Sequence, residues 1–202
     1  MACLWPRKYQ SGVGLVEVLI ATLVFAVGLL GMAGLQLAAK KNSHEALQRS
    51  IATSLARDIV ERIHSNPGQL SQYLLEDITA PIAGAKDCAS APGSTETAAL
   101  CTPAELAAYD LADWRALLFG AAETVVINAA VVSAGGLVDP RACIRSSGRD
   151  VKIVLAWRGV NPMTSSAESD CGAGAGIYGP EDELRRLLVL TTQVAGFSGT
   201  AL

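Results

Sequence analysis

The stretch VGLVEVLIATLVFAVGLLGMAGLQLAA, residues 13–39, decides how the rest of this sequence is interpreted. It holds 27 residues and a single charged side chain, Glu17. Because about 20 mostly apolar residues are enough for a helix to cross a bilayer, the stretch predicts a membrane-spanning helix. The twelve residues before it include Arg7 and Lys8 and no acidic residue, so the apolar run follows a short basic segment.

Three kinds of targeting segment fit this arrangement: a secretory signal peptide, a signal anchor that stays uncut, and a prepilin leader. A secretory signal peptide usually has an apolar core of about 7–15 residues, and this run is much longer. Ala38 and Ala39 nevertheless resemble the small residues of a secretory cleavage site. Charge does not choose an orientation, because the two basic residues before the run are matched by Lys40 and Lys41 after it.

Glu17 is the most informative residue of the run. A carboxylate inside a membrane is costly unless it is paired or reaches the interface, so a functional role is the first hypothesis. The alternative is that Glu17 lies near the helix end and its side chain reaches the lipid headgroups. Its position alone leaves both interpretations open.

The residues around Glu17 resemble the type IV prepilin signature, a short basic leader that ends in Gly before an apolar helix with Glu at its fifth position. Here Gly12 ends the leader, and Glu17 is fifth when Val13 is counted as the first mature residue. The resemblance implies that a prepilin peptidase cuts after Gly12 and methylates the amine of Val13. It also implies that Glu17 neutralises the N-terminal amine of a neighbouring subunit, a pairing that offsets the desolvation of both charges.

An amphipathic continuation of the helix is expected over residues 40–66. Its apolar residues recur mainly at four-residue spacing, which predicts a stripe that packs on a globular domain. The stripe consists of Leu47, Ile51, Leu55, Ile59, Val60 and Ile63. Asn66, Pro67 and Gly68 then end the helix, and residues 69–77 are predicted to form a further short helix.

A second helix is predicted inside the globular part. Residues 79–102 are rich in Ala, Pro, Gly, Ser and Thr and predict a loop. Thr102 and Glu105 then form a capping box, with Pro103 at the first helical position. The apolar face of this helix consists of Leu106, Leu111, Trp114, Leu117 and Leu118.

Strands are predicted over residues 123–133, 142–145, 150–158 and 186–194. The last is apolar on both faces, which favours a central strand. Short loops between the strands favour an antiparallel sheet. The expected fold class is therefore α+β, with a long membrane-spanning and amphipathic N-terminal helix packed on an antiparallel sheet, and the resemblance to prepilins implies that this fold is type IV pilin-like.

Four cysteines, Cys88, Cys101, Cys143 and Cys171, follow the apolar run, and Cys3 precedes it. An even number of cysteines behind a membrane-targeting segment favours disulfides in an oxidising compartment such as a periplasm. The alternative is four reduced cysteines in a core. Four cysteines allow three connectivities.

Residues 101–114 (CTPAELAAYDLADW), residues 28–36 (GLLGMAGLQ) and the segment from Cys143 to Cys171 resemble the minor pilins called type IV pilus modification protein, or PilV. Among the three connectivities we favour Cys88–Cys101 with Cys143–Cys171. The resemblance implies a minor pilin that primes type IV pilus assembly in a tip complex with other minor pilins.

The implied organisation is a leader over residues 1–12, a helix over 13–66 and a periplasmic domain over 67–202. Within the helix, residues 13–39 would span the membrane and residues 40–66 would be amphipathic. Expected partners are other minor pilins, the major pilin, the prepilin peptidase and the inner-membrane assembly platform. The precursor would cross the inner membrane once and later enter the pilus, at its tip. The alternatives are a minor pseudopilin of a type II secretion system and a signal-anchored periplasmic binding or adhesion domain.

The sequence contains no pattern typical of an enzyme, and we expect neither catalysis nor a cofactor. With a net charge of −3 it has no basic stripe for nucleic acid. No Cys-x-x-Cys or His-x-x-x-His spacing predicts a metal site. His44 and His64 offer no pairing with a nucleophile. The glycine-rich residues 172–179 lack the strand and helix that flank a phosphate-binding loop.

Overall fold

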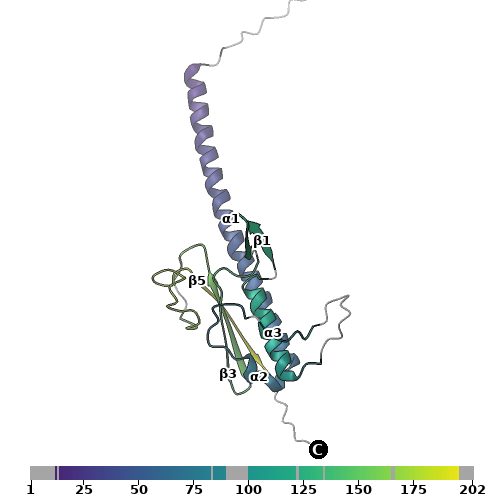
Figure 1. Cartoon of the computed structure of the whole chain (residues 1–202). Coiled ribbons are helices and arrows are strands. Elements are labelled where there is room, and N and C mark those ends of the chain that lie inside the picture. The colour runs from purple at the N-terminus through teal and green to yellow at the C-terminus, as the bar shows by residue number, and fades with distance from the viewer. Residues whose placement is uncertain are drawn as a thin grey trace, which may run out of the picture. The chain divides into compact units, whose positions relative to one another are not determined.

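The computed structural model in Figure 1 describes residues 12, 14–82, 84–89, 100–121, 123–133, 135–164 and 167–195. The chain divides into two compact units, Met1–Ser43 and His44–Leu202. The helix α1, Leu15–Ser65, begins in the first unit and ends in the second. The second unit adds η1 (Pro67–Gln69), α2 (Leu70–Tyr73), α3 (Pro103–Leu118), β1 (Thr124–Ile127), β2 (Ala130–Ser133), β3 (Arg141–Ser147), β4 (Asp150–Arg158) and β5 (Arg185–Gln193). A long helix followed by antiparallel sheets is the α+β class that the sequence predicts.

The buried stripe of α1 differs in one respect from the prediction. Leu55, Ile59 and Ile63 are buried as expected, whereas Leu47 is 58% exposed. In an α-helix each residue turns by about 100°, so residues four apart differ by about 40° in direction. Over the four steps from Ile63 back to Leu47 this drift moves the side chain almost to the opposite face. Gln48 takes the buried place at this level of the helix.

The predicted capping box at the start of α3 is present. The Glu105 backbone N–H donates to the Thr102 hydroxyl, and the Thr102 backbone N–H donates to the Glu105 carboxylate. Such a reciprocal pair satisfies two backbone donors that a helix start would otherwise leave unpaired. Pro103 occupies the first turn, where the missing N–H costs nothing.

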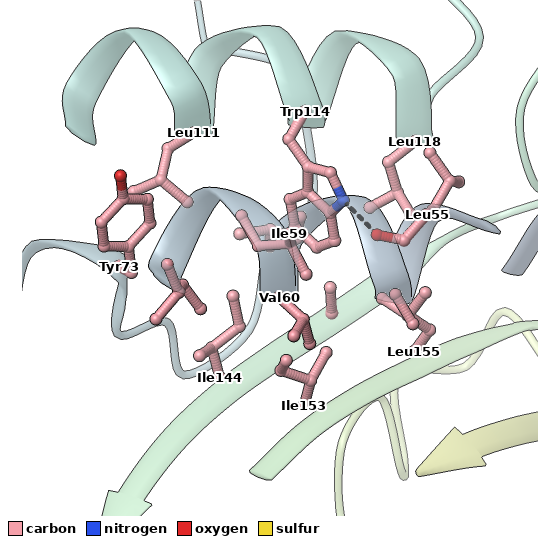
Figure 2. Close-up of a cluster of buried hydrophobic side chains, with 14 of the residues drawn as sticks. Leu55, Ile59, Val60, Tyr73, Leu111, Trp114, Leu118, Ile144, Ile153 and Leu155 are labelled. Carbon is pink, nitrogen blue, oxygen red and sulfur yellow. Dashed lines mark hydrogen bonds between the residues drawn. The ribbon is translucent and has the colours of Figure 1, made fainter. Parts of the chain in front are cut away.

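Helix α3 packs antiparallel to the second part of α1. At one end Asn66 donates to the Pro103 carbonyl at 2.7 Å, and further along the Trp114 indole N–H donates to the Leu55 carbonyl at 2.8 Å. Figure 2 shows Trp114 pointing from α3 onto α1, with this hydrogen bond drawn as a dashed line. This hydrogen bond offsets the cost of burying the indole N–H of Trp114.

Three layers form the core, with α1 between α3 and the larger sheet (Figure 2). Trp114 and Leu118 of α3 pack on α1 from one side. Ile144 and Ile153 of the larger sheet pack on α1 from the other side. Because α1 is covered on two sides over residues 52–63, this part of the helix belongs to the domain core.

The larger sheet has the order β3-β4-β5, and both pairings are antiparallel. The central strand is β4, with Val151, Ile153 and Leu155 buried toward the helices and Val154 buried on the opposite face. The prediction that residues 186–194 form a central strand is therefore wrong. Strand β5 is an edge strand. Both of its faces carry apolar side chains, because each face contributes to one of the two hydrophobic clusters.

Residues 123–133 form a hairpin and not the single strand that was predicted. Strands β1 and β2 pair antiparallel in a separate two-stranded sheet, with Val126 opposite Val131. Asn128 and Ala129 join them with φ values of 51° and 62°. Two positive φ values define a type I′ turn, for which Asn-Gly is the usual signal, and the Asn-Ala pair here conceals it.

The stem of the hairpin depends on glycine at two positions. Gly120 and Gly136 have φ values of +69° and +76°, in the left-handed region that favours glycine. A Cβ atom on Gly120 would overlap the Gly135 carbonyl, and one on Gly136 would overlap the backbone of Gly120. The segment before β1 and the segment after β2 can therefore pass each other only because neither Gly120 nor Gly136 carries a side chain.

The predicted helix over residues 69–77 ends earlier than expected. Helix α2 stops at Tyr73, and Leu74 is extended. Leu75 then exchanges two backbone hydrogen bonds with Ile144 of β3, at 2.8 and 2.9 Å. Pairing with the free edge of β3 outcompetes a longer helix here, because it satisfies backbone groups of both segments.

Candidate functional site

The processing site predicted from the sequence lies just before α1. Gly12 is exposed, and Val13 and the residues before Gly12 lie outside the described residues. Helix α1 begins at Leu15, and the Gly14 carbonyl accepts hydrogen bonds from the backbone N–H groups of Glu17 and Val18, at 3.0 and 3.2 Å. The predicted cleavage position after Gly12 therefore lies before the first residue of α1, Leu15.

Glu17 occupies the first turn of α1, exposed beside Val18, Ala21 and Phe25. Acidic residues are favoured at this end of a helix, because the backbone N–H groups carry partial positive charge. No basic group pairs with Glu17 within the part of the chain that the structure describes. A carboxylate in apolar surroundings without a counter-ion is a place where a cation from another molecule would be stabilised.

Helix α1 contains a segment long and apolar enough to cross a membrane, by length and composition. Every described side chain over residues 15–43 is exposed in the single chain, including Leu23, Phe25 and Leu30 at 65–74%. A continuous apolar surface of this extent is stable only when lipid or another protein covers it. This segment is therefore a surface suited to insertion into a membrane or to association with another protein.

Within the second unit, Glu45 connects the first residues of α1 to the rest of the unit. The Glu45 carboxylate accepts hydrogen bonds from the backbone N–H groups of Val160 and Asn161 at 2.6 and 3.3 Å, and it pairs with Arg186 at 3.3 Å. Burial by itself raises the pKa of Glu45, but the two backbone donors and the Arg186 charge outweigh it, so the pKa lies below its ordinary value. The group thus fastens α1 to the loop that leads from β4 toward β5.

A polar cluster joins the end of α1 to α3. Arg62 pairs with Asp58, Asp110 and Asp113, at 2.9, 3.3 and 2.6 Å, and Tyr73 donates to Asp110 at 2.6 Å. Burial and the Asp110 hydrogen bond raise the pKa of the Tyr73 phenol. Each member of this cluster has a hydrogen-bond or ion-pair partner within it, so the cluster fastens the end of α1 to α3.

The four cysteines after the apolar run form two disulfides, Cys88–Cys101 and Cys143–Cys171, which is the pairing favoured above. The second bond is buried against Val154, whereas both cysteines of the first are partly exposed. Asp77 lies near the sulfur atoms of Cys143 and Cys171. The three do not form a metal site, because bonded sulfurs are not thiolate ligands.

Two family models match this chain. The model described as the prokaryotic N-terminal methylation motif matches residues 7–33, and the model described as type IV pilin Tt1218 matches residues 34–112. No curated protein and no solved structure matches. The two matches cover consecutive segments, the apolar start of α1 and then its continuation into the first part of α3, and together they support a type IV pilin. The long apolar helix followed by antiparallel sheets agrees with the type IV pilin-like fold.

Sequence reasoning found the residues of the motif but not those that fasten the helix to the domain. It placed Gly12, Val13 and Glu17 in a recognised pattern, whereas Glu45 was one of several charges on an amphipathic helix. Its partner Arg186 lies 141 residues away, and no local pattern joins the two. The exposed β1–β2 hairpin was also missed, because its turn lacks glycine.

Proposed function

We propose that this protein is a PilV-like minor pilin that helps to initiate assembly of a type IV pilus. The observation that carries the proposal is the match of the methylation motif to residues 7–33, a range that includes Glu17 in the first turn of an exposed apolar helix. The pilin match over residues 34–112 supports the same assignment for the continuation of α1. The protein acts by assembling with other pilins and catalyses nothing.

In this proposal the prepilin peptidase removes residues 1–12 by cutting after Gly12 and methylates the new amine of Val13. Residues 13–39 hold the precursor in the inner membrane, residues 40–66 continue into the domain, and residues 67–202 lie in the periplasm. Other minor pilins, the major pilin and the inner-membrane assembly platform are its partners. After assembly the protein belongs to a complex at the pilus tip.

Glu17 carries the docking step. A neighbouring pilin presents an N-terminal ammonium group in the same apolar layer, and the two opposite charges remove the desolvation penalty of each other when they meet. The described part of the chain supplies no competing cation for Glu17. The carboxylate therefore selects a partner that brings its own positive charge.

The experiment compares Glu17→Ala with the matched control Val18→Ala in native membranes. We expect Glu17→Ala to reduce co-purification with the other minor pilins and the number of pili, while Val18→Ala leaves both unchanged. Equal processing of both variants to a Val13 start ensures that docking, and not cleavage, is measured. Wild-type complex formation and piliation by Glu17→Ala would contradict the docking role.

A deletion strain separates the pilus from the related secretion machinery. Loss of pili with normal export of secreted enzymes supports the minor pilin. Loss of enzyme export with normal pili would instead identify a minor pseudopilin of a type II secretion system.

A further inference from the structure

The β1–β2 hairpin is an apolar feature of the second unit that lies outside its hydrophobic core. Every residue of both strands is exposed, and Val126 and Val131, which lie opposite each other, are 72% and 70% exposed. Residues 124–133 contain no charged side chain. An exposed apolar patch of this kind usually marks an interaction site.

The backbone of the hairpin is also incompletely paired. Its sheet has two strands, so within the described part of the chain each strand has one edge without a neighbouring strand. Proteins commonly protect such edges with charged side chains, proline or bulges, and this hairpin has none of these devices. A two-stranded hairpin is marginal in water by itself, and a third strand would stabilise it.

The hairpin stem lies beside the part of α1 that belongs to the second unit. Its stem residues Gly120, Glu123 and Gly135 line a hollow together with Ile51 and Leu55 of α1. Figure 1 shows the hairpin apart from the three-stranded sheet. Under the proposed function this chain assembles with other pilin subunits, so a neighbouring subunit is the protein that can reach the exposed hairpin.

A lipid bilayer is a poorer occupant than a protein. Both outer edges would bring unpaired N–H and C=O groups into hydrocarbon, which offers them no hydrogen bonds. An open strand of another protein satisfies these groups and also covers the valine side chains.

We propose that the β1–β2 hairpin pairs with an open sheet edge in the globular domain of a neighbouring pilin subunit. This inference rests on the proposed function, because only a pilin assembly brings such a neighbour. The pilin fold offers the required edge: strand β5 of this chain pairs with β4 on one side and has no strand on its other side within the described residues. The contact joins two different surfaces, the hairpin of one subunit and a sheet edge of another, so it is heterologous.

The experiment places a benzophenone amino acid at Thr124 of the full-length protein in native membranes, on the hairpin face that carries Val126. The matched control has the same probe at Ser147, an exposed strand residue at the far end of β3. After irradiation, mass spectrometry identifies the attached peptide. We expect a strand at the sheet edge of another pilin subunit to be attached from Thr124 and not from Ser147.

A charged variant tests the pairing without breaking the hairpin. The double variant Val126→Lys with Val131→Glu places opposite charges across the strands, which preserves their pairing but protects the edges. We expect the Thr124 crosslink and the pili to be lost, while processing and the amount of protein stay unchanged.

Other results would overturn the inference. The inference is wrong if the protein co-purifies with other pilins but the probe at Thr124 attaches only to lipid, only to pilin segments away from a sheet edge, or to nothing. In these cases the proposed function stands. If the protein co-purifies with no pilin, the proposed function fails and the inference fails with it.

Discussion

Ala129 is the residue at which local strain is most open to test. It has a φ of 62° in the hairpin turn, a conformation that costs an L-residue about 1–2 kcal/mol. We expect Ala129→Gly to stabilise the hairpin by about 1 kcal/mol, because Asn-Gly is the preferred type I′ turn. Hydrogen exchange of the Val126 and Val131 amides should slow by a factor of about five.

The control is Ala130→Gly in strand β2, where φ is not positive and glycine only adds freedom to the unfolded chain. This variant should speed the same exchange. Equal exchange in both variants would show that the turn of Ala129 is not strained.

Glu45 predicts a specific acid sensitivity. Its folded-state pKa lies below the ordinary value of 4.5, because the backbone donors of Val160 and Asn161 and the Arg186 charge outweigh burial. The ionised group therefore contributes stability that is present above pH 4.5 and lost as the pH falls through the folded-state pKa. Glu45→Gln keeps the size and the acceptor oxygen of the side chain but removes the charge.

The measurement is the unfolding free energy of full-length protein in detergent, between neutral pH and pH 3, for wild type and Glu45→Gln. We expect the difference between them to be largest near neutral pH and to shrink as the pH falls. A difference that does not change with pH would show that the Glu45 charge contributes nothing to folding.

Residues could be predicted from the sequence where their role depends on near neighbours. The capping box of Thr102 and Glu105 and the Glu17 motif are both local patterns, and the sequence predicts them directly. Glu45 and Gln48 depend on partners far along the chain, Arg186 and Val138. Their roles emerge only when the sheet and α1 are brought together.

At the scale of elements, helices were predicted better than strands. The 3.6-residue period and the stop signal at Asn66 and Pro67 predicted α1 to within two residues at each end. The sheet order was less accessible, because an edge strand that serves two hydrophobic clusters has the same apolar pattern as a central one. The hairpin was hidden by its Asn-Ala turn.

The two disulfides should differ in their response to reductant. Cys143 and Cys171 are 1% and 2% exposed, whereas Cys88 and Cys101 are partly exposed. Thiol–disulfide exchange requires access to the sulfur. We expect mild reduction of the folded protein to open Cys88–Cys101 first, and Cys143–Cys171 only on unfolding.

Alkylation followed by peptide mass spectrometry measures this order. Removing either bond by paired Cys→Ala substitutions should lower stability by roughly 3–4 kcal/mol in the chain-entropy model. Simultaneous reduction of both bonds in the folded protein would contradict the difference in burial.

For the whole molecule, the central claim is that this chain is a processed pilin. The fold could be predicted at the level of a long helix joined to an antiparallel α+β domain, and the two family matches support the pilin assignment. Processing at Val13 and entry into a minor-pilin complex depend on other proteins, so they are proposals that follow from the motif.

The most direct measurement is the intact mass and N-terminal sequence of the protein isolated from native membranes. We predict a chain that begins at Val13 and carries one additional methyl group, as expected after cleavage following Gly12. A chain that retains residues 1–12 would indicate an uncut anchored domain and contradict the account. A start near Lys40 would identify a secreted protein and remove the role assigned to Glu17.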